Sequence, residues 1–81
     1  MTMSDNTLRY SMLIRWSDED RVYIVEVPEL PGCKTHGTTY QEAVTQAQDA
    51  IETWIYGHRA AGHPIPKPSV YSEWNRGVPL R

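Results

Sequence analysis

The residues most able to do chemistry lie close together in "PELPGCKTHGTTYQEA", the stretch from Pro28 to Ala43. It contains Cys33, the single cysteine of the chain, and His36 three positions later. A cysteine and a histidine within hydrogen-bond reach can act as nucleophile and general base, and the same residue types can bind a metal ion. The alternative is a folded connector in which neither residue reacts. The secondary structure around the stretch decides between these interpretations.

Two strands are predicted before this stretch. Apolar residues occupy alternate positions from Leu8 to Trp16, and a period of two is typical of a strand. The segment Arg21–Val27, "RVYIVEV", is rich in β-branched and aromatic residues and predicts a second strand. The polar turn between them, "SDED", is short, so the strands should form an antiparallel hairpin. Because both faces of the second strand carry apolar residues, we expect both faces of the sheet to be at least partly covered.

A rigid turn and a short third strand are predicted next. Pro28 and Pro31 have no amide hydrogen to donate and Gly32 tolerates a positive φ, so "PELPGC" is expected to form a fixed turn. The segment Cys33–Gly37 then predicts a strand that ends at its glycine.

A long helix is the clearest element of the sequence. Thr39 can cap its N-terminus, and Glu42 three residues later completes a capping-box pattern. Gly62 and Pro64 predict its end. Apolar residues at spacings of three and four form one stripe that should pack on the sheet: Ala43, Val44, Ala47, Ala50, Ile51, Trp54 and Ile55.

This arrangement argues against a reaction centre. Side chains at positions 33 and 36 of one strand point to opposite faces, so Cys33 and His36 should be separated, and we predict no catalytic residue. A metal site made from Cys33, His36, His58 and His63 would require a recognised ligand spacing, which these positions lack. We therefore predict neither a metal site nor a cofactor.

The charged residues do not favour a nuclease or a nucleic-acid-binding protein either. The formal net charge is −2, and the acidic run Asp18–Asp20 is typical of a solvated hairpin tip. Two-metal nuclease chemistry needs several converging carboxylates, but Glu26 is the single acid on the two predicted strands. Four basic residues could form a local patch, although without interleaved aromatics they are a weak RNA-binding pattern: Arg9, Arg15, Arg21 and Lys34.

Aromatic residues are more informative. The chain has 3 tryptophans and 5 tyrosines, which is more than a small domain can bury completely. Tryptophan and tyrosine are enriched where proteins meet. We predict that a partner or a second subunit is contacted through five of them: Trp16, Tyr23, Tyr56, Tyr71 and Trp74.

Length and composition bound the remaining possibilities. A chain of 81 residues is one domain with a small core, and a single cysteine cannot form an internal disulfide. We expect self-association as a dimer or tetramer, with the second subunit covering the free face of the sheet. The lone cysteine and the polar first residues favour the cytoplasm. No apolar segment approaches the roughly 20 residues that span a bilayer, so no membrane partner is expected.

An ordered set of motifs resembles the HicB family of antitoxin-like proteins. They are "YIVEVP" in the second strand, the "PELPGC" turn, "GTTYQEA" at the helix start and "PIPKP" after the helix. The similarity covers about residues 8 to 70, most of the chain. It implies an α+β fold of order β-β-β-α-β, with an antiparallel three- to four-stranded sheet and one helix on one face. Such a sheet is similar to a truncated ribonuclease-H-like or double-stranded-RNA-binding-like domain.

The resemblance also implies a function without catalysis. HicB proteins bind and neutralise a small HicA toxin that cleaves mRNA. The alternative is a stand-alone HicB-like oligomeric regulatory domain with a different partner. We expect a flexible N-terminus at residues 1–7, the HicB-like domain at 8–70 and an extension at 71–81 that could dock on the domain. Only 12 residues follow Ser69, too few for a DNA-binding module, so direct DNA binding is not expected.

Overall fold

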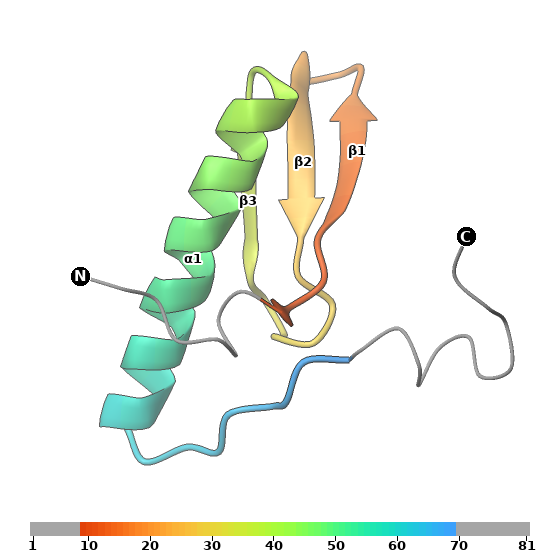
Figure 1. Ribbon diagram of the computed structural model, residues 1–81. Helices are drawn as coiled ribbons and strands as arrows, with labels where there is room; N and C mark the ends of the chain where they lie inside the picture. The colour runs from red at the N-terminus through yellow and green to blue at the C-terminus, as the bar shows by residue number, and fades with distance from the viewer. Residues whose placement is uncertain (1–8, 70–81) are drawn as a thin grey trace, which may run out of the picture.

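The computed structural model describes residues 9–69, which form a three-stranded sheet and one helix (Figure 1). The strands are β1 (Leu13–Ser17), β2 (Val22–Glu26) and β3 (Lys34–Gly37), and the helix is α1 (Tyr40–Ala60). Neighbouring strands are antiparallel in the order β1-β2-β3, so β2 is central. The predicted α+β fold with one helix on an antiparallel sheet is confirmed. The expected fourth strand, the terminal segments 1–7 and 71–81, Tyr71 and Trp74 lie outside the described residues.

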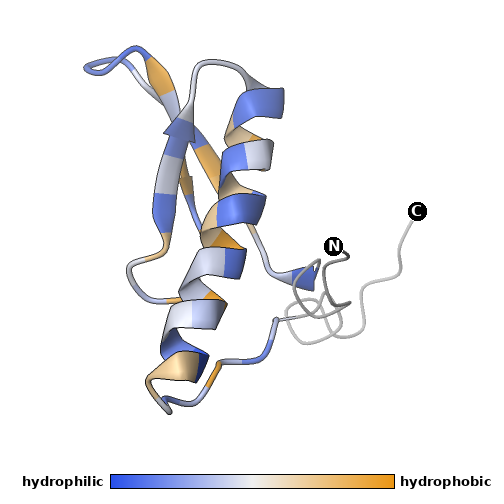
Figure 2. Cartoon of the chain, turned by 90° about the vertical axis from the view of Figure 1, so that its left-hand side faces the viewer, coloured by the Kyte–Doolittle hydropathy of each residue, from blue (hydrophilic) through white to orange (hydrophobic). Residues whose placement is uncertain are grey.

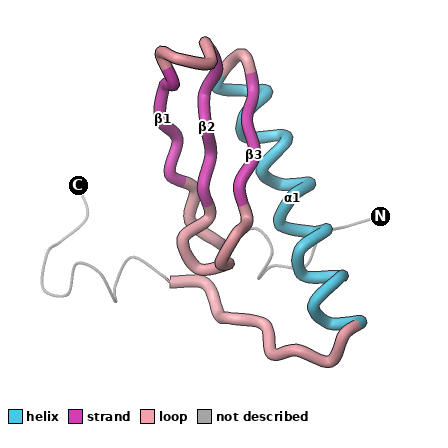
Figure 3. Tube along the Cα trace, turned by 180° about the vertical axis from the view of Figure 1, so that it is seen from behind, coloured by secondary structure: helices cyan, strands magenta, loops and turns pink. Residues whose placement is uncertain are grey.

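The strand register decides which residues face the helix. Ile14 and Thr35 are the cross-strand partners of Val25, so the three side chains share one face of the sheet. On this face Val25 is fully buried against Ala43 and Ala47 of α1. The helix lies across β3 and β2 and leaves β1 at the margin of the sheet (Figures 1 and 3). Hydrophilic and hydrophobic residues alternate along α1, as expected of a helix with one face on a sheet (Figure 2).

The opposite face of the sheet, which we call the open face, is not covered by any element within residues 9–69 (Figure 3). Its side chains are a mixture of apolar, polar and charged groups: Leu13, Arg15, Ser17, Val22, Ile24, Glu26, Lys34 and His36. Lys34 and Glu26 form a 3.5 Å ion pair between β3 and β2. The sequence predicts apolar residues on both faces of the second strand. On the open face these residues are Val22 and Ile24, and charged side chains surround them.

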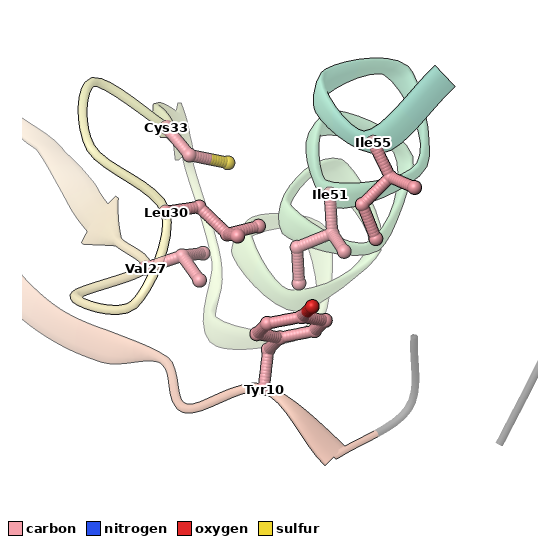
Figure 4. Packing of buried hydrophobic residues seen from close by; sticks show 6 residues of the cluster. All are labelled: Tyr10, Val27, Leu30, Cys33, Ile51 and Ile55. Atoms are coloured by element: carbon pink, nitrogen blue, oxygen red, sulfur yellow. The ribbon is translucent and has the colours of Figure 1, made fainter. Parts of the chain in front are cut away.

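The first strand is shorter than the sequence predicts. It begins at Leu13, whereas the alternating pattern extends back to Leu8. Tyr10 is buried beneath α1 (Figure 4), and its hydroxyl donates a hydrogen bond to the carbonyl of Pro66. The amide of Ser11 donates to the carboxylate of Glu29, 3.0 Å from Oε2. Since these residues bond to the turn and to the segment after the helix, they do not continue the ladder with β2.

The "PELPGC" segment is a fixed turn, as predicted. The amide of Leu30 donates to the carbonyl of Val27 over 3.0 Å, and the amide of Cys33 donates to the carbonyl of Leu30 over 2.9 Å. Gly32 has a φ of +80°, which only glycine adopts without strain. The turn buries Leu30 completely in the larger core cluster (Figure 4), whose members are Tyr10, Val27, Leu30, Cys33, Ile51 and Ile55.

Both predicted ends of the helix are confirmed. The hydroxyl of Thr39 accepts a 3.0 Å hydrogen bond from the amide of Glu42. The Glu42 carboxylate bonds to Thr38 instead of closing a capping box on Thr39, with 2.7 Å to the Thr38 hydroxyl. At the other end Gly62 has a φ of +79°, and the amide of His63 donates to the carbonyl of His58, which is a Schellman motif.

Candidate partner-binding surface

Cys33 and His36 do not form a reaction centre. Cys33 is 6% exposed, and its sulfur points toward α1 among the core residues (Figure 4). His36 is exposed and is the cross-strand partner of Ile24, on the open face. Burial raises the pKa of the Cys33 thiol above its ordinary value of 9.0, so little of it is the reactive thiolate at neutral pH. Because Cys33 faces α1 and His36 lies on the open face, the two side chains are on opposite sides of the sheet.

The other histidines lie at the end of the helix. The ring of His58 stacks on Trp54 with centroids 3.5 Å apart, and His63 meets His58 edge-on at 5.6 Å. Nδ1 of His58 lies 3.0 Å from the carbonyl oxygen of Trp54, so this nitrogen carries the hydrogen. Within residues 9–69 no three histidine, cysteine or carboxylate groups lie close enough together to hold a metal ion.

Three aromatic side chains form a continuous surface where the β1–β2 hairpin meets the start of α1. We call Trp16, Tyr23 and Tyr40 the aromatic array. Trp16 and Tyr23 are cross-strand partners whose rings meet edge-on with centroids 5.0 Å apart. The ring of Tyr23 stacks on Tyr40 at 4.3 Å. The array thus joins β1, β2 and α1 in one row.

The array remains open to solvent. Trp16 is 46% exposed and Tyr40 is 63% exposed, while Tyr23 between them is half-buried. Partial burial, and then the neighbouring Tyr40, raise the pKa of Tyr23 above 10.0, so its hydroxyl stays protonated at neutral pH. A shallow depression beside Tyr40 is lined by Gln41, Val44 and Thr45. The array therefore offers aromatic rings, the neutral hydroxyl of Tyr23 and an adjoining hollow of mixed polarity to a partner.

Arg21 lies beside Trp16, at the end of the array nearest the tip of the β1–β2 hairpin. Its guanidinium carbon lies 5.5 Å from the Trp16 ring centroid, within the range of a cation–π contact. The same guanidinium forms a 3.2 Å ion pair with Asp18. Arg21 has a φ of 58°, a left-handed conformation that costs a residue with a Cβ about 1–2 kcal/mol. A strained residue of this kind is more common at functional sites than elsewhere.

Of the five predicted interface residues, the structure brings two together. Trp16 and Tyr23 come together in the array, whereas Tyr56 is 77% exposed on the outward face of α1 and belongs to no aromatic contact of the described chain. Tyr71 and Trp74 lie outside the described residues. The sequence analysis missed Tyr40. Its signal is Gly37, the cross-strand partner of Tyr23, since a position without a side chain lets the backbone of the following helix approach this end of the sheet.

The aromatic array consists of one tryptophan and two tyrosine side chains. Its geometry suits binding, because aromatic rings held on two strands and the start of a helix present a large contact area with little entropy to lose. A model of the HicB-like antitoxins of bacterial toxin-antitoxin systems matches residues 10–78.

The chain belongs to this family.

Two relatives are similar to this HicB-like domain over most of their length. The UPF0150 protein Ta0767 of Thermoplasma acidophilum is 38% identical over 60 residues, which cover 74% of this chain and 86% of the relative. The UPF0150 protein ssr1765 of a Synechocystis strain is 34% identical over 58 residues, 72% of each chain.

A solved structure shares the fold. The crystal structure of TTHA0281 from Thermus thermophilus superposes with a TM-score of 0.55 at 23% sequence identity. The superposition covers 80% of this HicB-like chain and 84% of TTHA0281. Among residues 9–69, α1 is not apolar enough over a sufficient length to cross a membrane.

Proposed function

We propose that this HicB-like domain is the antitoxin of a toxin-antitoxin pair, and that it neutralises a HicA-type mRNA-cleaving toxin by covering part of the toxin's surface. The observation that supports this most directly is the exposed aromatic array beside Arg21, in a chain of an antitoxin family. The mechanism needs a complementary interface and no chemical step, so the domain itself is not an enzyme. It acts in the cytoplasm, where mRNA is available to the toxin.

The residue types of the array support binding of this kind. Trp, Tyr and Arg dominate the small set of interface residues whose loss costs the most affinity. Trp16 and Tyr23 are held by the β1–β2 ladder and Tyr40 by the first turn of α1, so binding does not have to order them.

The charges beside the array also suit a toxin. Asp18, Glu19 and Asp20 are exposed at the hairpin tip, directly before Arg21. A protein that binds RNA carries basic groups to contact phosphates. Carboxylates next to an aromatic surface would attract such a basic surface and accelerate association.

The second candidate is a stand-alone HicB-like domain whose function depends on its own oligomer. The open face favours this candidate, because Val22 and Ile24 are only half-buried there and Leu13 is 40% exposed. Self-association as a dimer or tetramer is compatible with both candidates.

Co-expression with a HicA-type toxin encoded in the same genome tests the proposal. We expect the wild-type chain to relieve the growth arrest caused by the toxin, and the purified complex to cleave mRNA only after the two proteins are separated. The variant Tyr40→Ala should fold but protect poorly. Absence of such a toxin from the genome, or continued arrest with the folded wild-type chain present, would favour the stand-alone oligomer.

A further inference from the structure

A groove runs between β3 and one flank of α1. The strand β3 lies at one end of the strand order, and α1 lies over it (Figures 1 and 3). The groove has a volume of about 380 Å³. It is lined by residues of β3 and of the strand's first neighbour on one side and by the middle of α1 on the other: Cys33, Lys34, Thr35, Asp49, Ala50 and Thr53. A further strand added beside β3 would lie along this groove.

The backbone of β3 directs polar groups toward this side. The amide of Val27 donates to the carbonyl of Cys33 over 3.0 Å, and these two residues continue the register of the β2–β3 pair. Hydrogen-bonded and non-hydrogen-bonded positions alternate along an antiparallel pair. Thr35 therefore bonds to β2, whereas Lys34 and His36 turn their backbone groups away from β2. Each of these two residues offers one N–H and one C=O to a strand laid along the groove.

The helix side of the groove suits an apolar side chain. Residues of an added strand that lie opposite Cys33 and Thr35 would point to the helix side, as those two residues do. There they would meet the part of α1 that carries Ala50 and Trp54, which are both half-buried. The indole nitrogen of Trp54 donates a 3.0 Å hydrogen bond to the carbonyl of Pro31, so this ring is already fixed in position.

The charges of the groove favour a basic occupant. Asp49 is exposed on the flank of α1 that lines the groove. The ammonium group of Lys34 lies 3.5 Å from the carboxylate of Glu26 on the open face, so its charge is directed to the other side of the sheet. A lysine or arginine on the helix side of an added strand would face Asp49, and opposite charges across an interface select the partner and its register.

We infer that this groove binds an extended segment of a partner protein, which pairs antiparallel with β3 and turns one apolar and one basic side chain toward α1. Recognition by strand addition draws affinity from backbone hydrogen bonds and specificity from alternate side chains. The added strand would leave α1 across the middle of a wider sheet. The groove is separate from the aromatic array, which joins β1, β2 and the start of α1, so the inference does not depend on toxin binding.

Peptides selected on the folded full chain from a phage-displayed library of random dodecapeptides test the inference. We expect the selected sequences to alternate apolar and polar residues and to carry lysine or arginine. Synthetic copies should bind Asp49→Lys at least about tenfold more weakly than wild type. Glu52→Lys is the matched control and should bind like wild type, because it makes the same change of charge at an exposed acid of α1 that does not line the groove.

Two further measurements separate strand pairing from simple attraction between charges. Only alternate amides of a paired strand face its neighbour, so N-methyl groups at one set of alternate positions of the peptide should abolish binding, while those at the other set should preserve it. In amide hydrogen exchange, the bound peptide should slow exchange at Lys34 and His36 and leave Thr35 unchanged. A library that yields no binder, selected peptides that bind Asp49→Lys as tightly as wild type, or equal effects of the two methylation patterns would overturn the inference.

Discussion

The carboxylate of Glu29 accepts a 2.9 Å hydrogen bond from the backbone amide of Ser69, which lies 40 residues later in the chain. The same carboxylate accepts from the amide of Ser11 at 3.0 Å and from its hydroxyl at 2.9 Å. Glu29 thereby connects the "PELPGC" turn to the segment entering β1 and to the segment that follows α1. The Glu29 side chain therefore joins three parts of the chain that also meet in the larger core cluster.

Replacing this carboxylate by an amide should loosen the fold. In Glu29→Gln one carboxylate oxygen is replaced by an NH₂ group, a donor that faces the donors of Ser11 and Ser69. Hydrogen bonds to a charged group are worth more than neutral ones, but the site is only partly buried. We therefore expect the free energy of unfolding to fall by about 1 kcal/mol. Urea denaturation followed by circular dichroism measures the change. An unaltered midpoint would show that the connection contributes nothing to stability.

Acid should remove the same contribution. Burial acts to raise the pKa of Glu29, but the hydrogen bonds from Ser69 and Ser11 outweigh it and hold the pKa below the ordinary value of 4.5. A depressed pKa in the folded state stabilises the fold above pH 4.5, and this stability is lost as the pH falls through the folded pKa. Denaturation midpoints should therefore decline more steeply below pH 4.5 in wild type than in Glu29→Gln. Parallel profiles for the two proteins would contradict this.

Gly37 should tolerate no side chain. A Cβ at this position would lie 2.4 Å from the backbone nitrogen of Ala43, so α1 would have to move away from β3. We expect Gly37→Ala to cost about 2 kcal/mol or more, as overpacking of a core does. Gly57→Ala is the matched control, since nothing lies within 4 Å of its Cβ and alanine favours a helix by about 1 kcal/mol. Thermal denaturation should move in opposite directions for the two variants. Equal behaviour would mean that α1 does not depend on close approach at Gly37.

Replacing Arg21 by glycine should have different effects on the stability of the fold and on toxin binding. Glycine adopts a φ of 58° without strain, so Arg21→Gly should leave the free energy of unfolding unchanged or raise it by up to about 1 kcal/mol. The exposed ion pair with Asp18 that it loses is worth little. The same variant should bind the toxin more weakly, because the cation beside Trp16 is gone. Calorimetry gives the first quantity and titration with the toxin the second; a destabilised variant with normal affinity would reverse both expectations.

The Cys33 thiol should be unreactive in the folded protein. Its burial and raised pKa both disfavour attack on a disulfide reagent. We expect reaction with Ellman's reagent to be slow in buffer and fast in denaturant. Neither His36→Ala nor Cys33→Ala should affect toxin binding. Rapid labelling of the native thiol would contradict its burial, and loss of binding in either folded variant would place that residue in the toxin interface.

Local patterns in the sequence were sufficient to predict α1. The cap at Thr39 and the glycine at position 62 act within one turn of the helix, so their effect can be read without knowing the rest of the fold. The β1–β2 hairpin could be predicted in the same way, because the alternation of apolar residues and the polar turn are also local patterns. The separation of Cys33 from His36 followed from strand geometry alone.

Contacts between distant parts of the chain were not predictable in this way. Alternation alone extended β1 back to Leu8, but Tyr10 and Ser11 bond to Pro66 and Glu29 instead. The aromatic array needs the register that places Tyr23 beside Gly37, and the place where α1 crosses the sheet. Single-residue properties therefore suggested Trp16 and Tyr23, gave equal weight to the outward-facing Tyr56, and gave no reason to choose Tyr40.

The affinity of a HicA-type toxin from the same genome for Tyr40→Ala and Tyr56→Ala tests the central claim most directly. Both substitutions remove an exposed tyrosine from α1, but only the first belongs to the array. Isothermal titration should show that Tyr40→Ala weakens binding by about 2 kcal/mol, roughly thirtyfold, while Tyr56→Ala binds like wild type. Equal affinities for wild type and Tyr40→Ala, with both proteins folded, would show that the toxin binds another surface.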